Sequence, residues 1–300
     1  MAQTLTEIRA MLQQAGLRPL KQLGQNFLID HNLLAAVVDL AAITPGDVVL
    51  EVGPGTGTLT DELLATGARV LAVELDAGLA RLLERRYASN ESLTLLHADI
   101  LAGKHALNGE VLAAMGELTA GPVKLVSNLP YNVAVPVVCE CLVQSAAARR
   151  SVAGGGRFDS LTITVQREVA LRLAAPAGSG DYGPASVLVA LLGEVHLGKR
   201  LGPQAFWPRP KVESQMLRID AIGANPEVVP DIPVLRQLLN WAFGHRRKRI
   251  GSRGRFRQAP WPPERIEAAL AAAEIDPGCR PEMIEPARFA KMAAALSVPG

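Results

Sequence analysis

The sequence predicts an α/β protein in which a parallel sheet carries helices on both faces and a small all-helical domain follows. Two observations lead to this fold class. Four β-rich runs alternate with stretches of helical periodicity between residues 48 and 147. A Pro-rich segment at 221–233 then precedes runs that have only helical periodicity. We therefore expect a large domain over residues 1–222 and a small helical domain over residues 230–300.

Each element follows from its periodicity and from the residues that start or end it. Asp30, for example, can cap the helix that follows it. The expected helices are 5–17, 31–43, 76–88, 134–147, 233–243, 263–273 and 286–296, with one more after the Gly-rich loop at 53–57. The expected strands are 48–53, 69–75, 93–100 and 122–128, one that runs into a helix within 161–174, and a late pair at the sheet edge, 187–197 and 212–220. Loops are expected at 19–30, 101–121 and 149–156.

The composition indicates a cytoplasmic globular protein. The apolar fraction is 49% and the charged fraction 20%, which favours a packed core over disorder. No apolar run reaches transmembrane length, and Glu7 and Arg9 lie where a signal peptide needs an apolar segment. Because the cysteines and histidines form no CxxC motif and no cluster, we expect neither a disulfide framework nor a metal site. Nothing in the sequence requires an oligomer.

Positive charge is concentrated near the C-terminal end. The net charge is only +2, yet residues 245–257, "HRRKRIGSRGRFR", hold seven Lys or Arg and no acid. Such a run can be merely a solvated face. In a chain whose other charges are balanced, it favours contact with a polyanion, in particular with phosphates. We call residues 245–257 the basic segment.

A Gly-rich loop after the first strand of the sheet indicates a nucleoside site. In "EVGPGTG" (51–57) glycine lets a ligand approach the backbone, and the following helix offers free N–H groups. Glu74 ends the next strand, where a carboxylate can accept both hydroxyls of a ribose. The alternatives are an ordinary turn and an acid that caps a helix. The glycine spacing differs from that of a dinucleotide site, and no Lys-Ser or Lys-Thr follows as in a phosphate-binding loop.

The same loop resembles the first motif of methyltransferases that use S-adenosylmethionine. This cofactor contains a ribose and an adenine but no phosphate. Asp99 in "HADI", at the end of the third strand, can accept a hydrogen bond from the adenine amino group of such a cofactor. Its alternative role is that of an ordinary loop acid.

The stretch "NLPYN" (128–132) ends the fourth strand, at the edge where open α/β sheets bind ligands. It resembles the (D/N)-x-P-Y motif of methyltransferases that modify exocyclic amino groups, whose nitrogen lone pair is delocalised into the base. The Asn128 side-chain oxygen and the Leu129 carbonyl can accept from that amino group, which favours a pyramidal nitrogen and stabilises its developing positive charge. Pro130 fixes the turn, and Tyr131 offers a face for stacking. The alternative is a turn with a packed tyrosine.

A series of motifs in order resembles the bacterial ribosomal RNA small subunit methyltransferase A family, the rRNA adenine N6,N6-dimethyltransferases. The motifs are "LGQNFLID", "EVGPGTGTLT", "HADIL", "NLPYNVA", "QREVALRL", "YGPASV", "FWPRPKVES" and "FGHRRKR". The resemblance covers residues 15–255 and implies a Rossmann-like methyltransferase domain with a small helical RNA-contacting domain. It implies methyl transfer from S-adenosylmethionine to two adjacent adenines in a hairpin loop near the 3′ end of 16S rRNA, in the small ribosomal subunit. The family is also associated with subunit assembly.

The resemblance also implies roles for individual residues. The implied cofactor-binding residues are Asn26, Leu28, Gly53, Gly55, Glu74, Asp99 and Asn128. The implied catalytic residues are Asn128, Leu129, Pro130, Tyr131 and Phe206. Phe206 resembles an aromatic residue that sandwiches the target base opposite Tyr131, and its alternative role is core packing. The implied RNA-binding residues are Arg246, Arg247, Lys248, Arg249 and Arg253.

Three stretches depart from the family's pattern. The usual R-R-K-T-L is here "RRKRI", followed by two glycines, so the details of RNA contact differ. Segments 101–121 and 146–157 are longer than usual and fall on expected loops.

Two other functions stay open at this point. One is that of the related large-subunit rRNA dimethyltransferases that confer macrolide resistance, against which the form "NLPYNVA" argues. The other is that of a non-catalytic assembly factor that binds immature small subunits through the basic segment. The intact Gly53, Glu74, Asp99 and Asn128 argue against this as a sole role.

Overall fold

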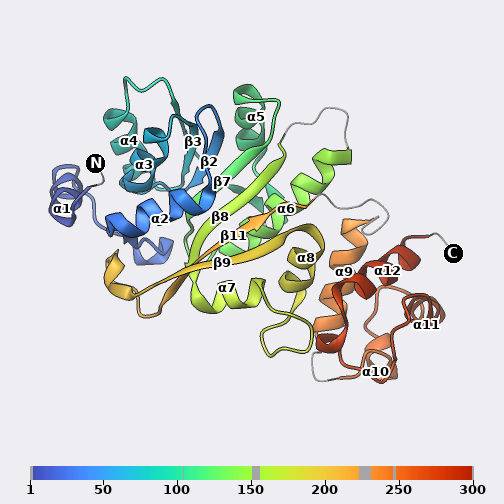
Figure 1. Cartoon of the computed structure of the whole chain (residues 1–300). Helices are drawn as coiled ribbons and strands as arrows, with labels where there is room; N and C mark the ends of the chain where they lie inside the picture. The colour runs from blue at the N-terminus through green and yellow to red at the C-terminus, as the bar shows by residue number, and fades with distance from the viewer. Residues whose placement is uncertain (1–2, 104, 151–155, 223–230, 246–247, 299–300) are drawn as a thin grey trace. The chain divides into compact units, whose positions relative to one another are not determined.

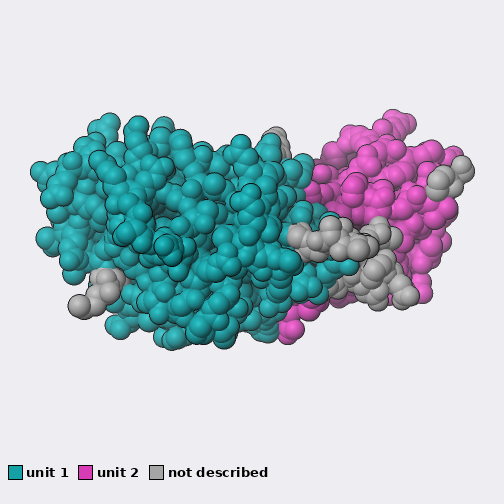
Figure 2. Space-filling model, turned by 90° about the horizontal axis from the view of Figure 1, so that it is seen from above, with its two compact units in different colours: residues 1–170, 195–221 teal, residues 171–194, 222–300 magenta. Residues whose placement is uncertain are grey.

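The computed structural model divides the chain into two compact units (Figure 2). It describes residues 3–103, 105–150, 156–222, 231–245 and 248–298. Unit 1 comprises Met1–Ala170 and Val195–Ala221, and unit 2 comprises Leu171–Glu194 and Ile222–Gly300. The sequence-based boundary assigns residues 171–194 to the first domain, whereas in the structure they belong to unit 2. No helix in the described part of the chain is long and apolar enough to cross a membrane.

Unit 1 is built on a seven-stranded sheet in the order β4-β3-β2-β7-β8-β11-β9 (Figure 1). The strands are β2 (Val48–Val52), β3 (Arg69–Glu74), β4 (Leu93–His97), β7 (Val123–Asn128), β8 (Phe158–Gln166), β9 (Glu194–Leu201) and β11 (Ser214–Asp220). The pairs from β4 to β8 are parallel, and β11 is antiparallel to β8. The predicted parallel sheet is therefore confirmed. Since β2, β3, β4 and β7 run the same way, the residues at their carboxyl ends meet at one edge.

Helices cover both faces of this sheet (Figure 1). They are α2 (His31–Ala41), α3 (Thr58–Ala65), α4 (Ala77–Arg86), α5 (Gly109–Leu118) and α6 (Ala134–Arg150), with α1 (Leu5–Gln14) before them. Apolar side chains of α2 and α3 form one buried cluster with β2 and β3, which includes Leu34, Leu63 and Val70. As predicted, Asp30 caps α2, because its side chain accepts from the backbone N–H groups of Asn32 and Leu33.

Two short strands far apart in the sequence pair beside the main sheet. β1 (Phe27–Leu28) lies antiparallel to β10 (Phe206–Trp207), with Leu28 opposite Phe206. The sequence predicts only a loop at 19–30, since a two-residue strand has no detectable periodicity. This pairing fixes the segment that contains Asn26 next to the edge of the main sheet.

Two further segments differ from the sequence prediction. The apolar run within 187–197, expected to be a strand, begins in α8 (Pro184–Leu192), and only its end lies in β9. Six of the nine residues of α8 are buried, so the apolar run shows neither a clear period of two nor one of 3.6. Pro at the first helical turn is the signal that was missed. The expected loop at 101–121 contains α5 and the small hairpin of β5 (Leu101–Gly103) and β6 (Ala106–Leu107).

The described part of unit 2 is helical. Its main helices are α8, α9 (Ile232–Phe243), α11 (Pro263–Ala272) and α12 (Pro286–Ser297), with the short α10 (Arg253–Phe256) in the basic segment. α12 packs against α8, α9 and α11. The Tyr182 hydroxyl donates to the carbonyl of Ile284 at 2.8 Å, which ties residues 171–194 to the C-terminal helices. The three helices predicted beyond residue 230 are confirmed, while α10 was missed because it is a single turn.

Candidate active site

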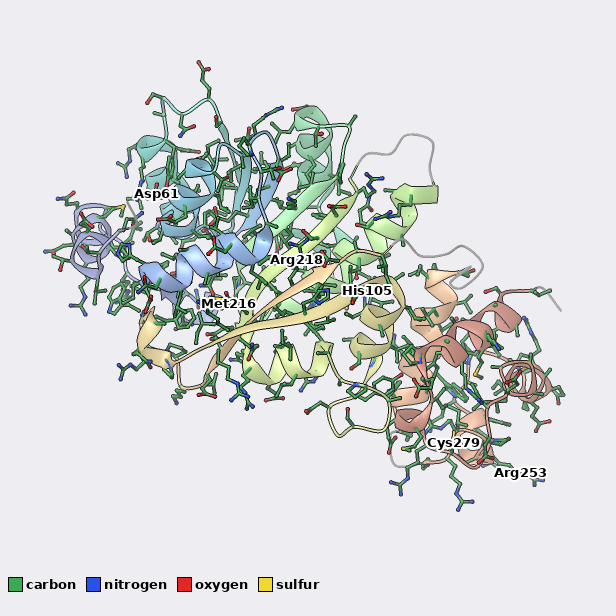
Figure 3. All side chains as sticks on the ribbon, viewed as in Figure 1. Asp61, His105, Met216, Arg218, Arg253 and Cys279 are labelled. Carbon is green, nitrogen blue, oxygen red and sulfur yellow. The ribbon has the colours of Figure 1, made fainter. Side chains whose placement is uncertain are left out.

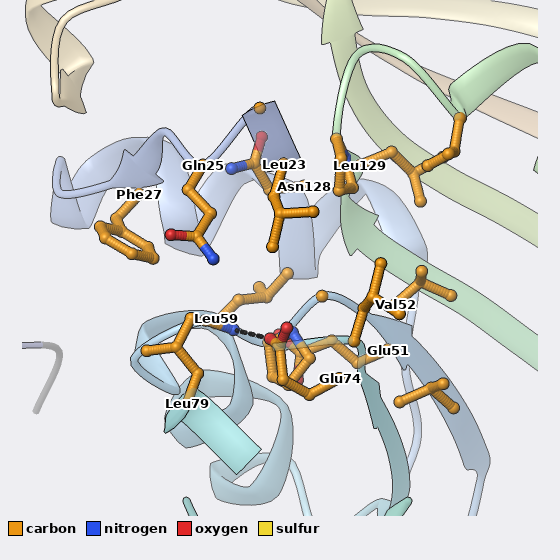
Figure 4. Close-up of a pocket in the computed structure, with 18 of the residues that line it drawn as sticks. Leu23, Gln25, Phe27, Glu51, Val52, Leu59, Glu74, Leu79, Asn128 and Leu129 are labelled. Carbon is orange, nitrogen blue, oxygen red and sulfur yellow. Dashed lines mark hydrogen bonds between the residues drawn. The ribbon is translucent and has the colours of Figure 1, made fainter. Parts of the chain in front are cut away.

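One cavity lies at the carboxyl ends of β2, β3, β4 and β7 in unit 1 (Figure 4). Every residue that the family resemblance implies for cofactor binding lines it, as do Leu129, Pro130 and Tyr131. Strand ends at one edge of a parallel sheet bring these side chains together from four separate parts of the chain. Among the implied catalytic residues, only Phe206 does not line the cavity.

The Gly-rich loop after β2 depends on backbone angles that side chains rarely adopt. Gly55 has φ +63° and Gly57 has φ +83°. A Cβ at Gly55 would lie 2.8 Å from the ring of Phe27, and one at Gly57 would lie 2.5 Å from the Tyr87 hydroxyl. These glycines therefore allow the loop to turn tightly between the β1 segment and α4.

The carbonyls of this loop are held from behind by the end of α4. Arg86 donates to the carbonyl of Thr56 at 3.0 Å, and the Tyr87 hydroxyl lies 3.0 Å from the carbonyl of Gly57. Asp61 pairs with Arg86 and also accepts from Tyr87. The bond from Arg86 to Thr56 therefore ties the Gly-rich loop to the end of α4. Sequence reasoning missed all three side chains, because no local motif connects residue 61 with residues 86 and 87.

Glu74 occupies the end of β3 and is only 5% exposed. One of its carboxylate oxygens accepts the backbone N–H of Gly55 at 3.0 Å, drawn as a dashed line in Figure 4, and the other accepts that of Asp76 at 2.8 Å. Burial raises the pKa of Glu74, and these two backbone donors oppose the rise. Each oxygen keeps a further lone pair, so the carboxylate can still accept from a ligand.

Asp99 follows β4 at the mouth of the cavity and is exposed. One carboxylate oxygen accepts the backbone N–H of Leu101 at 2.9 Å, which fixes the direction of the side chain. The second oxygen has no hydrogen-bond partner among the bonds found in the described residues, so it can accept from a ligand amino group.

Asn128 is the last residue of β7, and its amide is oriented by the loop that contains Asn26. The amide nitrogen of Asn128 donates to the backbone carbonyl of Asn26 at 2.9 Å. The side-chain oxygen is therefore the atom left to accept from a ligand. In Figure 4, Asn128 faces Glu74 and Glu51 across the cavity. The end of β7 is also tied to β2, because the Ser127 hydroxyl donates to the carbonyl of Val52 at 2.5 Å.

The two aromatic residues of the implied base site lie in different surroundings. Tyr131 is partly buried, and its hydroxyl lies 2.8 Å from that of Ser214. Burial raises the pKa of Tyr131, so the phenol is neutral at pH 7. Phe206 is only 3% exposed and packs in a core cluster with Leu28 and Leu34. The ring of Phe206 thus has no open face in this structure, which agrees with its alternative role in core packing.

Glu51 is a buried acid in the cavity wall to which sequence reasoning gave no separate role. It is 2% exposed, and the Thr60 hydroxyl donates to it at 2.7 Å. Burial is the main cause that raises the pKa of Glu51 to about 8. The hydrogen bond from Thr60 opposes this rise, and the nearby carboxyl groups of Glu74 and Asp61 add to it. The carboxyl is therefore largely protonated at pH 7.

This pKa predicts how folding stability depends on pH. The folded protein keeps a proton on Glu51 that the unfolded chain, with a pKa near 4.5, has lost. The free energy of unfolding should therefore fall as pH rises from about 4.5 to about 8, by up to about 1.4 kcal/mol per pH unit. Glu51→Gln, which cannot titrate, should have a flatter profile and exceed the wild type in stability at pH 8. Urea denaturation at several pH values measures this. The exposed Glu91→Gln is the control, and parallel profiles for wild type and Glu51→Gln would contradict the assignment.

The basic segment differs from a simple charged face. Arg255 is 1% exposed and donates to backbone carbonyls of α9 and of the following loop, namely those of Trp241, Ala242, His245, Lys248 and Arg249. It satisfies carbonyls that a helix end leaves free, and so it organises the segment from inside. Lys248, Arg249 and Arg253 are exposed, and Arg253 is labelled in Figure 3. Arg246 and Arg247 lie outside the described residues.

The charge of the cavity restricts which ligands it fits. Three carboxyl groups line it, those of Glu51, Glu74 and Asp99, and its described lining contains no Lys, Arg or His. A phosphate would find no cation there, whereas a positively charged nucleoside would be favoured. S-adenosylmethionine has this chemistry, because its sulfonium and ammonium outnumber its single carboxylate and it also carries a ribose and an adenine.

The sheet order, the Gly-rich loop after β2 and the acid at the end of β3 define a Rossmann-like, class I methyltransferase. Comparison with known proteins narrows this class. The sequence profile of the ribosomal RNA adenine dimethylases matches residues 17–269, and the chain belongs to this family.

Curated relatives and solved structures agree with this assignment. The chain is 39% identical to the ribosomal RNA small subunit methyltransferase A of Rhodococcus erythropolis, over 96% of this chain and 91% of that protein. It is 38% identical to the protein of the same name from Mycobacterium tuberculosis, over 96% and 86% of the two chains. The fold resembles that of a dimethyladenosine transferase from Plasmodium falciparum, with TM-score 0.67, 19% identity and coverage of 89% of this chain and 95% of that chain. It also resembles the 23S rRNA methyltransferase ErmE, with TM-score 0.59, 24% identity and coverage of 91% and 100%.

Proposed function

We propose that this protein transfers methyl groups from S-adenosylmethionine to N6 of two adjacent adenines in a hairpin loop near the 3′ end of 16S rRNA, in the small ribosomal subunit. The printed name of the curated relatives supports the choice of subunit. The single observation that carries the chemistry is the Asn128 amide, whose nitrogen is bound to Asn26 and whose oxygen is left for an amino group beside an acidic cavity. The reaction would take place in the cytoplasm, where ribosomal subunits are made in bacteria.

Different residues of the cavity would bind different parts of the cofactor. Glu74 would accept the ribose hydroxyls, and Asp99 would accept the adenine amino group. The backbone of Asn26, Leu28, Gly53 and Gly55 would enclose the rest of the molecule. When bound, the cofactor supplies an electrophilic methyl group on a sulfonium. The acidic lining would favour binding of this cation, and neutral Glu51 would limit the repulsion among the three carboxyls.

Asn128 and Leu129 would prepare the target nitrogen. The side-chain oxygen of Asn128 and the carbonyl of Leu129 would accept the two N6 hydrogens, which draws the lone pair out of conjugation with the ring. The same two acceptors would stabilise the positive charge that develops on N6. No dedicated base is needed, since the methylated ammonium is acidic and loses its proton to water.

The target adenine must leave its stack to reach this position, which costs a few kcal/mol. Stacking of the adenine on the face of Tyr131 would offset this cost by about 1–3 kcal/mol. A sandwich with Phe206 would require that ring to leave the core cluster, where it is 3% exposed. We therefore assign the stacking to Tyr131 and propose that Phe206 supports the β1–β10 pairing.

The small helical domain, proposed to span residues 230–300, would contact the rRNA through the basic segment. Arg249→Glu should weaken binding to small subunits about tenfold at low salt, because one phosphate contact is lost and a repulsion is added. The slope of log K against log salt should become shallower by about one. Filter binding at several KCl concentrations measures both. Lys291→Glu on α12, an exposed site with the same charge change, should have little effect, and equal effects for the two variants would contradict the assignment.

The proposed function is tested by methyl transfer from tritiated S-adenosylmethionine to ribosomal subunits that lack the modification, followed by nucleoside mass analysis. Dimethyladenosine in 16S rRNA is the expected product. Transfer to 23S rRNA alone would move the protein to the large-subunit enzymes. Binding to small subunits without any transfer would leave only a role in subunit assembly.

A further inference from the structure

The hydroxyl of Tyr131 makes a contact to which the proposed function gives no role. Its oxygen lies 2.8 Å from that of Ser214, within hydrogen-bonding distance, and either group can be the donor. Tyr131 belongs to the turn after β7, whereas Ser214 is the first residue of β11. The two residues are 83 positions apart in the sequence.

The topology of the sheet explains how they meet. β8 lies between β7 and β11. Because β11 is antiparallel to β8, its first residue lies opposite Gln166, the last residue of β8. Ser214 is therefore at the same edge as the end of β7, one strand away, and the tyrosine side chain reaches across the end of β8 to it.

Burial makes this contact costly to lose. Ser214 is 0% exposed, so a lost partner would not be replaced freely by water. The backbone holds the ring of Tyr131 at one end and the serine holds its hydroxyl at the other. With both ends of the side chain held, the ring cannot swing about the Cα–Cβ bond without breaking this contact. Ser214 itself does not line the cofactor cavity.

We propose that Ser214 is a positioning residue that holds the ring of Tyr131 at the place where the target adenine stacks. This inference rests on the proposed function, because the stacking role of Tyr131 comes from it. A tilted ring would displace N6 from the side-chain oxygen of Asn128. A displacement of about 1 Å can lower the rate of a reaction by about 10²-fold.

A second buried serine of the same sheet provides a matched control. Ser160 lies on β8 and is 1% exposed, and its hydroxyl has no partner among the described residues. Ser160→Ala thus removes a buried hydroxyl without removing a hydrogen bond. It should leave methyl transfer unchanged, which separates the effect of the Tyr131 bond from that of an altered core.

The test is a double-mutant cycle with Tyr131→Phe, which keeps the ring, and Ser214→Ala. Each single variant is expected to lower kcat about five- to tenfold, and the double variant should be no worse than either one. KM for small subunits and the Kd of S-adenosylmethionine should change less than about twofold. Effects that multiply in the double variant, or equal losses in Ser160→Ala, would overturn the inference.

A measurement without substrate checks the hydrogen bond itself. With ¹³C placed at the Cζ atom of the three tyrosines, the resonance of Tyr131 is the one lost in Tyr131→Phe. Ser214→Ala should shift that resonance and leave those of Tyr87 and Tyr182 in place. An unshifted resonance would overturn the inference. If the wild type methylates neither subunit, the proposed function is overturned, and the stacking role of Tyr131 with it. If the wild type is active but the effects of Tyr131→Phe and Ser214→Ala are independent, only the role of Ser214 is overturned.

Discussion

Asn128→Ala should lower kcat for methyl transfer by about 10²–10³-fold, the range found when one group that stabilises transition-state charge is removed. The Asn128 amide nitrogen is bound to the carbonyl of Asn26, and only its oxygen can accept from the target amino group. Alanine removes this acceptor and leaves the N6 lone pair conjugated with the base. Leu129 still offers its carbonyl, so a residual rate is expected.

Transfer of tritiated methyl groups to small subunits, with single-turnover kinetics, measures this loss in the chemical step. Asn90→Ala, in an exposed turn of the same unit, should behave as the wild type. Because Asn128 also lines the cofactor cavity, the Kd of S-adenosylmethionine must be measured by calorimetry and should change less than about tenfold. A variant that turns over at the wild-type rate would show that Asn128 does not activate the nitrogen.

Glu74→Gln should weaken S-adenosylmethionine binding about 10²-fold. The carboxylate of Glu74 accepts two backbone N–H groups and has lone pairs left for the ribose hydroxyls. An amide of the same shape has one oxygen instead of two, so its NH₂ group must face a backbone N–H or a ribose hydroxyl. A buried hydrogen bond to a charged group is worth about 1.5–3 kcal/mol, and the variant loses the charge as well.

Calorimetric titration with S-adenosylmethionine measures the change, and Glu84→Gln on the exposed side of α4 is the control. Since the loss is in ground-state binding, a raised KM for the cofactor with a nearly unchanged kcat is expected. Thermal unfolding distinguishes a loss of cofactor affinity from damage to the fold, because Glu74→Gln and Glu84→Gln should both unfold within a few degrees of the wild type. Unchanged affinity in Glu74→Gln would remove this residue from the proposed cofactor site.

The alternation of strands and helices in unit 1 could be predicted because it depends on local patterns. β2, β3, β4 and β7 each have a β-rich apolar run bounded by turn residues. The cavity residues could be predicted as one group for a related reason, since a parallel sheet brings its carboxyl ends to one edge wherever they fall in the sequence. α8 could not be predicted, because a largely buried helix and a buried strand have the same kind of apolar run.

Contacts between distant segments had no sequence signal. Arg255 was counted as one more charge of the basic segment, yet it is buried among backbone carbonyls. Phe206 was assigned to the base site from its motif, while its burial depends on how β10 pairs with β1. The hydrogen bond between Tyr131 and Ser214 follows from the antiparallel direction of β11.

By itself, the sequence determined the chemical groups, the strands that end with them, and thus the class of reaction. Backbone periodicity and motif spacing are local properties, and they suffice to put Gly53, Glu74, Asp99 and Asn128 on strand ends. Only the tertiary structure decided which atoms of those groups remain free. Hydrogen bonds such as that from Asn128 to Asn26 form between residues 102 positions apart. Burial and hydrogen bonding, which set pKa values and orient side chains, exist only once the chain is packed.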